Sequence, residues 1–365
     1  MVTISDYLYS KASKNRIPLA GTFELSPVCN FSCKMCYVRK TKQQIHAEGK
    51  QLKKWQEWLE LARKCREAGT LFLLLTGGEP FLYPGFKELY INLHQMGFII
   101  SINSNATLID EKTVQWLKQY APSRINVTLY GGSPETYGRI CHNESGYDKA
   151  VKAIQMLQEA GVPVVINASM IPENSCDLES ILDFGKERGI NTRMSTYMFP
   201  PARRDRESGD SRFTSEEAAN VYIRKQKKQY SEDEYKEFLK GQLKSVSDNS
   251  ENDTWGDNVE YMRCRAGRSS FWVSWEGKMT ACGMLDFPLK VDPFKEDFST
   301  CWNQLTDSVR TAAVLSSCTD CEKREICRPC VAMIYTETGT VNEKAPYLCE
   351  MTDYIICLAK KELEE

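Results

Sequence analysis

Cysteine is the residue type in this sequence with the most evident capacity for chemistry. The 365-residue chain has 15 cysteines and only three histidines, His46, His94 and His142, none of which lies among the cysteine clusters. In a chain that opens without a secretory signal, Cys–x–x–Cys spacing indicates metal binding rather than disulfides. A ligand set rich in thiolate and poor in imidazole favours iron–sulfur clusters or all-cysteine zinc sites, and argues against a hydrolase built on Cys, His and Asp.

The sharpest motif is a cysteine triplet near the amino terminus, with three residues between Cys29 and Cys33 and two between Cys33 and Cys36. Three thiolates on one loop can bind three irons of a cubane cluster, which leaves the fourth iron open to another ligand. The alternatives are a zinc site that His46 completes, or three buried thiols. A structural zinc site needs four ligands, so three cysteines alone would make a poor one.

Composition bounds the possible partners. Apolar residues make up 42% of the chain, charged residues 26%, and the formal net charge is −2. This balance does not indicate binding to nucleic acid or to an anionic membrane. The longest apolar run, residues 71–75, is far shorter than the roughly 20 residues of a membrane span. We therefore expect a cytoplasmic protein with no membrane partner.

Strand and helix patterns alternate up to about residue 200. Strands are expected at 22–25, 71–76, 98–103, 124–130, 162–170 and 191–197, and helices at 52–68, 85–96, 110–119, 148–160 and 178–188. This rhythm predicts an α/β fold with a partial (β/α)6 TIM-like barrel. The cysteines that dominate the rest of the chain indicate that a cysteine-rich iron–sulfur domain follows it. The motifs follow strands, so they should meet at the carboxyl edge of the sheet.

Three segments are predicted from composition. The partial barrel should span residues 1–200, a charged helical bridge residues 201–258, and the cysteine-rich domain residues 259–365. The bridge shows helical patterns at 215–229 and 233–244. This segment is expected to be either a lid or, more simply, a solvated helical linker.

The first 200 residues resemble the radical S-adenosylmethionine (SAM) superfamily. The cysteine triplet follows the first strand, as in that family, and is followed by the aromatic Tyr37. Gly77–Gly78–Glu79 after the second strand resembles the family's glycine-glycine-glutamate motif. Residues 104–108, Ser–Asn–Ala–Thr–Leu, resemble its Thr–Asn–Gly–Thr–Leu segment. Residues 127–131 resemble the segment after strand four, although Tyr130 replaces an acid there.

The resemblance implies a SAM site. Gly77 and Gly78 would let the backbone approach the cofactor, and Glu79 would accept from the methionine ammonium group. Asn105 would lie near the ribose, Tyr37 near the adenine, Arg139 would pair with the methionine carboxylate, and Thr128 keeps the family's hydroxyl. The alternatives are a simple turn for the glycines, core packing for Tyr37 and a surface position for Arg139.

The carboxyl-terminal cysteines resemble the SPASM module of peptide-modifying radical enzymes. By that resemblance one auxiliary cluster is held by Cys318, Cys321, Cys327 and Cys349, and another by Cys264, Cys282 and Cys330. The fourth ligand of the latter could be Cys301, a substrate thiolate or water. The final Cys–x2–Cys pair departs from the family's usual spacing, and two zinc ribbons are the alternative. The remaining cysteines are expected to be small buried hydrophobic residues: Cys65, Cys141, Cys176 and Cys357.

Membership would imply three [4Fe–4S] clusters, SAM, and a one-electron donor such as flavodoxin or ferredoxin. The enzyme would form a 5′-deoxyadenosyl radical that takes hydrogen from a peptide, leaving a crosslink or another altered side chain. One alternative is a formylglycine-generating sulfatase maturase, disfavoured because Gly283 stands where that group has Asp. Another is a non-catalytic metal-site or electron-carrier protein. With only 28 residues before Cys29, a leader-binding domain is not expected there.

Overall fold

The computed structural model describes residues 3–200, 211–247, 264–286, 288–311, 318 and 321–364. Six strands from the first 200 residues form a parallel sheet in the order β6-β5-β4-β3-β2-β1. Their bounds are β1 Ala20–Glu24, β2 Phe72–Thr76, β3 Ile99–Ser104, β4 Arg124–Thr128, β5 Val164–Ser169 and β6 Thr192–Ser195. Each lies within two residues of the predicted start, and the predicted half-barrel architecture is confirmed.

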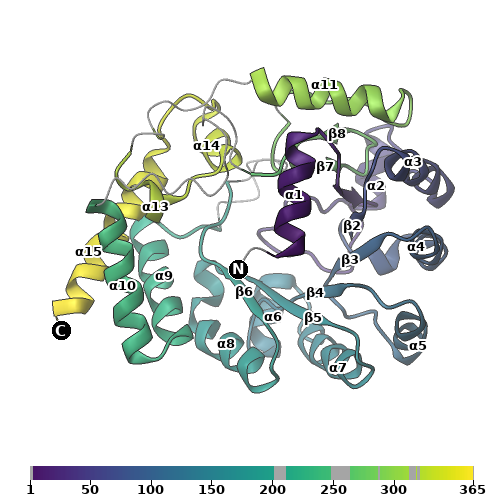
Figure 1. The fold of residues 1–365 in the computed structure, drawn as a ribbon. Helices are drawn as coiled ribbons and strands as arrows, with labels where there is room; N and C mark the ends of the chain where they lie inside the picture. Colours follow the sequence, from purple (N-terminus) through teal and green to yellow (C-terminus); the bar gives the residue numbers. More distant parts are fainter. Residues whose placement is uncertain are drawn as a thin grey trace.

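Helices follow the strands and cover the outer side of the sheet (Figure 1). The covering helices are α3 Trp55–Glu67, α4 Phe86–Gln95, α5 Glu111–Gln119, α7 Gly146–Glu159 and α8 Leu178–Glu187. Their apolar stripes face the sheet, so Trp58, Leu89 and Leu157 are fully buried. The sequence patterns did not reveal three further helices, α1 Ile4–Lys14, α2 Lys42–Ala47 and α6 Pro134–Cys141.

A strand from the cysteine-rich segment extends the same sheet. β7 Ser270–Val273 pairs in parallel with β1, and β8 Met279–Thr280 pairs antiparallel with β7. Gly21 makes this pairing possible, since a Cβ there would lie 2.6 Å from the ring of Phe271. The sheet therefore has eight strands and joins segments that are about 250 residues apart in the chain.

The carboxyl-terminal helices pack beside the helices of the charged bridge (Figure 1). α9 Ser215–Gln229 lies against α15 Pro346–Glu364 and α8, and α10 Glu232–Ser247 contacts α15 and α13 Arg324–Cys327. Two further helices of the described residues are α11 Phe298–Thr311 and α14 Val331–Thr338. α9 buries Ala218, Ala219, Val221 and Ile223, so this part of the bridge is packed rather than solvated.

The two predicted segment boundaries fall beside or within residues 201–210 and 248–263, which lie outside the described part of the chain. They therefore stay predictions. Within the described ranges, no helix combines the length and the hydropathy that crossing a membrane requires.

Candidate active site

The cysteine triplet lies on the loop after β1, and the loop after β2 fastens it in place. The amide of Gly78 donates to the carbonyl of Ser26 at 2.6 Å, and the amide of Glu79 donates to the carbonyl of Val28 at 2.9 Å. A Cβ at Gly77 would lie 2.4 Å from the Ser26 oxygen, and one at Gly78 would lie 2.3 Å from the Val28 oxygen. The glycines thus allow close approach of two loops, a role that the sequence had suggested only toward the cofactor.

Glu79 is 1% exposed and its carboxylate joins two loops. Oε1 accepts from the Phe81 amide at 3.1 Å and from Ser104 Oγ at 2.8 Å, while Oε2 accepts from the Asn105 amide at 2.8 Å. Burial raises the pKa of Glu79 to about 7, against the lowering effect of these hydrogen bonds. The side chain therefore fixes the loop after β3 relative to the loop after β2.

Asn105 stands directly against the cysteine loop. Its Nδ2 lies 3.6 Å from Cys29 Sγ and donates to Asn30 Oδ1 at 2.9 Å. The next residue, Ala106, has φ of 60°, a left-handed conformation that favours glycine. Alanine therefore adopts here a backbone conformation that favours glycine, with its methyl group buried.

The thiols of the triplet lie close together and face backbone donors. The Phe31 amide donates to Cys29 Sγ at 3.3 Å, and the Arg39 amide donates to Cys36 Sγ at 3.3 Å. Burial, together with the charges of Glu79, Cys33 and Cys36, raises the pKa of the Cys29 thiol to about 12. Amide donors aimed at sulfur stabilise thiolates, and they tune iron–sulfur clusters in this way.

The end of α6 supports the triplet from its other side. The amides of Ser32 and Lys34 donate to the carbonyls of Cys141 and Ile140 at 3.1 Å each. A hydrogen bond with the Cys141 thiol, together with burial, raises the pKa of Cys33. Burial also raises the pKa of Tyr130, as do the charges of Cys33 and Cys36. The residue that replaces the family's acid therefore lies close to the cysteine loop.

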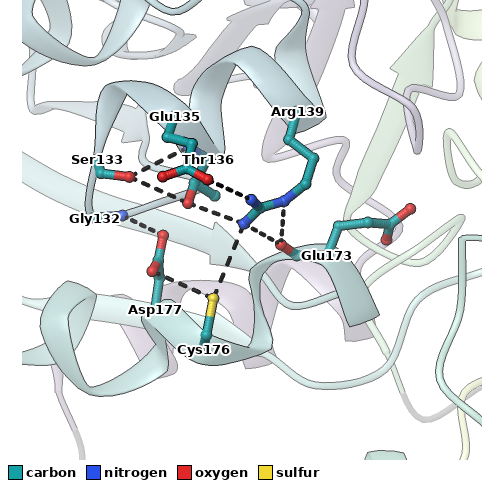
Figure 2. A network of polar contacts seen from close by, with 8 residues as sticks. All are labelled: Gly132, Ser133, Glu135, Thr136, Arg139, Glu173, Cys176 and Asp177. Carbon is teal, nitrogen blue, oxygen red and sulfur yellow. Dashed lines mark hydrogen bonds and ion pairs between the residues drawn. The ribbon is translucent and has the colours of Figure 1, made fainter.

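Arg139 holds α6 against the loop after β5 (Figure 2). Its Nε and Nη2 donate to the Glu173 carbonyl at 3.1 and 2.9 Å, and Nη2 also donates to Thr136 Oγ1 at 3.2 Å. Glu135 lies 3.6 Å from Nη1, and Cys176 Sγ lies 4.0 Å from Nη2. The side chain is 37% exposed, so the guanidinium stays open to solvent on one side.

A contact between Glu173 and the cysteine loop was not predicted from the sequence. Lys34, between Cys33 and Cys36, forms an ion pair with Glu173 Oε1 at 3.2 Å. The side chain of Glu173 thus contacts Lys34 of the cysteine loop, and its carbonyl oxygen accepts from Arg139. The two residues are 139 positions apart, so no local pattern could have predicted the pair.

Tyr37 and Thr128 are the other two residues that were expected to contact SAM. Tyr37 packs against Val38, Ile45 and Trp275, and it also lines a large cavity. Thr128 ends β4, and its carbonyl accepts from the Tyr137 hydroxyl at 3.3 Å. Tyr37 therefore packs against buried hydrophobic residues and also lines the cavity.

The carboxyl-terminal thiols fall into two groups. Burial raises the pKa of Cys327, and the thiols of Cys349, Cys318 and Cys321 raise it further. Burial likewise raises the pKa of Cys330, with additional effects from Cys264 and Cys282. Amides donate to Cys282 Sγ from Met284 at 3.5 Å and to Cys330 Sγ from Met333 at 3.4 Å. These neighbours are the ones that the resemblance to SPASM modules implies.

No three His, Cys, Asp or Glu side chains among the described residues are placed to hold one metal ion together. An iron–sulfur cluster binds each thiolate at a separate iron, so its ligands need not converge on one point. Cys301 is buried in α11, where burial and the acids Glu296 and Asp292 raise its pKa to about 11.

Two of the four remaining cysteines differ from expectation. Cys65 and Cys141 are buried as predicted, but Cys176 and Cys357 are exposed, so that prediction was wrong for them. Cys176 lies on the short helix η2 Pro172–Asp177 beside Arg139, and Cys357 lies on the exposed side of α15. A sequence pattern of isolated cysteines cannot tell which side of a helix faces the core.

The sequence profile of the Radical SAM superfamily matches residues 23–185. Residues 23–185 form a radical SAM domain. Over nearly its whole length, the chain is 23% identical to the AdoMet-dependent heme synthase of Methanosarcina barkeri, in a match of 341 residues that covers 90% of this chain and 96% of that protein. It is 23% identical over 170 residues to the sporulation killing factor maturation protein SkfB of Bacillus subtilis, covering 46% of this chain and 39% of that protein.

The radical SAM domain and the region after it also share a fold with a solved structure. SuiB of Streptococcus suis bound to its precursor peptide SuiA superposes with a TM-score of 0.64 at 17% identity, covering 94% of this chain and 80% of that one. The radical SAM family implies a [4Fe–4S] cluster and SAM. The donor set of Cys29, Cys33 and Cys36, with amides aimed at two of the sulfurs, fits such a cluster.

Proposed function

We propose that this radical SAM enzyme modifies a peptide substrate by abstracting a hydrogen atom from it, leaving a crosslink or another altered side chain. The observation that carries the proposal is the cysteine triplet at the carboxyl edge of a parallel half-barrel, fastened by Gly78 and Glu79. In parallel α/β sheets this edge is where ligands bind.

In this proposal Cys29, Cys33 and Cys36 hold the [4Fe–4S] cluster and leave one iron for SAM. Glu79, Asn105 and Arg139 surround the SAM site, as do Tyr37, Thr128 and the glycines Gly77 and Gly78. When bound, the cluster and SAM supply a 5′-deoxyadenosyl radical. The chain's own residues position the reacting groups and exclude water from them.

The second part of the proposal concerns the carboxyl-terminal thiols. Cys318, Cys321, Cys327 and Cys349 hold one auxiliary [4Fe–4S] cluster, and Cys264, Cys282 and Cys330 hold another. The two groups of mutually perturbing thiols support this assignment. If loaded, these two groups of thiols would hold redox centres that accept or donate one electron at a time.

A peptide substrate is supported by the relatives. SkfB is a maturation protein, and SuiB has been solved with a precursor peptide. In this chain a cavity of about 1310 Å³ lies between the cysteine loop, the β7–β8 hairpin and α14, and Tyr37 and Trp272 are in its wall. Drug-sized ligands occupy roughly 300–1,000 Å³, so this volume suits a peptide segment or another large substrate.

The formylglycine reaction is disfavoured by the packing around Gly283. A Cβ at this position would lie 2.6 Å from the Trp272 ring, so the acid that sulfatase maturases carry after this cysteine does not fit here. Trp272 is itself fixed, because its Nε1 donates to the buried Glu24 at 3.2 Å.

A second candidate is a reaction on a tetrapyrrole. The observation that favours it is the match to the AdoMet-dependent heme synthase, which covers 96% of that protein, whereas the match to SkfB covers 39% of its length. Both candidates share the radical chemistry and differ in the molecule that fills the cavity.

The decisive experiment is anaerobic reconstitution, followed by assays for iron, sulfide and 5′-deoxyadenosine in the presence of SAM and dithionite. We expect about twelve irons per chain, the content of three four-iron clusters, and 5′-deoxyadenosine as a product. The Cys33→Ala/Cys36→Ala variant should lose SAM cleavage but keep the carboxyl-terminal iron. A Cys357→Ala variant is the matched control, because this cysteine is exposed and lies outside the proposed ligand sets.

Two outcomes would contradict the proposal. Zinc in place of iron, without 5′-deoxyadenosine, would indicate a structural metal protein. SAM cleavage that survives in the Cys33→Ala/Cys36→Ala variant would show that the cluster lies elsewhere.

A further inference from the structure

The wall of the large cavity is unusually rich in cations. Among the described side chains that line it, six are basic and three are acidic: Lys40, Lys50, Lys53, Arg212, Lys278 and Lys290 against Glu276, Asp286 and Glu337. The whole chain carries a formal net charge of −2. The excess of positive charge is therefore a local property of this cavity and not of the protein as a whole.

The three acids of the wall are already engaged. Glu276 pairs with Lys50 at 2.5 Å, Asp286 pairs with Lys290 at 3.1 Å, and Glu337 pairs with Arg212 at 2.7 Å. The Arg212–Glu337 pair is largely buried, and the Tyr197 hydroxyl also donates to Glu337 at 2.8 Å. Each of these acids is paired with one of the six wall cations, so the positive charge that no acid of the described wall offsets belongs to Lys40, Lys53 and Lys278.

The other three cations pair with acids that do not line the cavity. Lys53 lies 3.6 Å from Glu57, Lys278 lies 3.1 Å from Asp292, and Lys40 pairs with Glu48. Asp292 is shared, since Lys295 is also within 3.9 Å of it. A group that enters the cavity therefore meets the ammonium groups on the wall before it meets their partners, and a concave wall concentrates their field.

Aromatic rings set the position of three of the lysines. The ammonium groups of Lys40 and Lys50 lie 6.0 and 5.7 Å from the ring centroid of Trp275, which is 2% exposed. Lys53 Nζ lies 4.7 Å from the centroid of Phe294. Cation–π contacts restrict where these long side chains can go, so less entropy is lost when they bind an anion.

We infer that this cavity binds its substrate through several carboxylate groups. The inference rests on the proposed function, in that it takes the cavity for the substrate site, and it specifies the substrate class. Two sources have this chemistry: an acidic peptide segment, and a small molecule with several carboxylates.

The test uses the reconstituted holoenzyme and defined probes. Binding of a fluorescein-labelled (Gly-Glu)6 peptide is compared with that of (Gly-Gln)6 by anisotropy, at about 50 mM and about 300 mM salt, since salt screens charge. A porphyrin with four carboxylates is the small-molecule probe. We expect at least one acidic probe to bind with salt-sensitive affinity, about tenfold more tightly than the Gln peptide.

Matched variants place the binding in the cavity. Lys53→Gln/Lys278→Gln removes two wall cations and should weaken binding of the acidic probe about fivefold or more. Lys112→Gln/Lys118→Gln removes two exposed charges from α5 and should leave binding unchanged. Binding of the peptide alone identifies an acidic peptide as the source, and binding of the porphyrin alone identifies a small polycarboxylate.

The inference is overturned if neither acidic probe binds, if (Gly-Gln)6 binds as tightly as they do, or if both double variants behave alike. SAM cleavage measured on the same samples separates this failure from failure of the proposed function. An enzyme that forms 5′-deoxyadenosine but binds acidic and neutral probes with equal affinity would be a radical SAM enzyme with a different substrate class.

Discussion

The Cα of Gly78 lies so close to Val28 that a Cβ at position 78 would fall 2.3 Å from the Val28 carbonyl oxygen. The neighbouring amides donate to Ser26 and Val28, so the loops after β1 and β2 form a single rigid unit. This contact between the two loops sets the position of the cysteine triplet.

Gly78→Ala should therefore separate the two loops. Backbone cannot yield as a flexible side chain would, so we expect a loss of about 1–3 kcal/mol in the free energy of unfolding and poor loading of the first cluster. Gly241→Ala in α10 is the control, because nothing lies within 4 Å of its Cβ position. Iron content and urea unfolding measure both effects. If Gly78→Ala loads iron as the unaltered protein does, the contact is not what positions the triplet.

Glu79 should make stability depend on pH. Burial raises the pKa of its carboxyl to about 7 in the folded chain, from an ordinary value of 4.5. The folded state therefore holds this proton more tightly than the unfolded state does. The resulting stability is complete below about pH 4.5 and is lost as the pH rises through about 7.

The measurement is urea unfolding of the cluster-free protein between about pH 5 and 8. Relative to Glu79→Gln, the unaltered chain should lose about 3 kcal/mol over the full range of the shift. Glu88→Gln, which alters an exposed carboxyl on α4, should follow the unaltered chain. Parallel pH profiles for the unaltered chain and Glu79→Gln would show that the carboxyl titrates normally.

Arg139 has two possible roles that a conservative substitution can separate. Arg139 donates to the Glu173 carbonyl from two nitrogens and could also bind the methionine carboxylate of SAM with two parallel hydrogen bonds. Lysine has a single cationic nitrogen and cannot do both. We expect Arg139→Lys to weaken SAM binding about tenfold or more, the effect of losing a two-pronged charged contact, with iron content unchanged.

Arg224→Lys is the control, since its guanidinium, on α9 of the bridge, holds the exposed carboxylate of Glu179 on α8. Equilibrium binding of SAM and urea unfolding are measured side by side. A variant that binds SAM normally but unfolds more easily would show that Arg139 only ties α6 to the loop after β5.

The contact between Gly283 and Trp272 predicts a coupled pair of substitutions. Gly283→Asp should cost about 1–3 kcal/mol of stability, because its Cβ would enter the Trp272 ring. Trp272→Ala makes room for it, so the double variant should be more stable than the sum of the two single effects indicates. A double-mutant cycle measures this coupling, and strictly additive effects would contradict it. Gly283→Asp should not confer formylglycine formation.

The sequence by itself determined the fold class and the identities of the chemical groups. Strand and helix periodicities are local, so the pattern of residues 1–200 predicted the six parallel strands. The spacing of Cys29, Cys33 and Cys36 is also local, and it predicted a site for an iron–sulfur cluster. The Gly77–Gly78–Glu79 motif could also be identified from the sequence, because its place directly after a strand is a local feature.

Only the tertiary structure decided which distant residues share the site. β7 joins β1 across about 250 residues, and with it come the Trp272–Glu24 hydrogen bond and the basic cavity. Lys34–Glu173 and Cys33–Cys141 are likewise formed by segments that meet only after folding. Such contacts depend on how strands align and how loops pack. Those relationships are set by the balance of burial and backbone hydrogen bonding over the whole chain, and no short stretch of sequence encodes them.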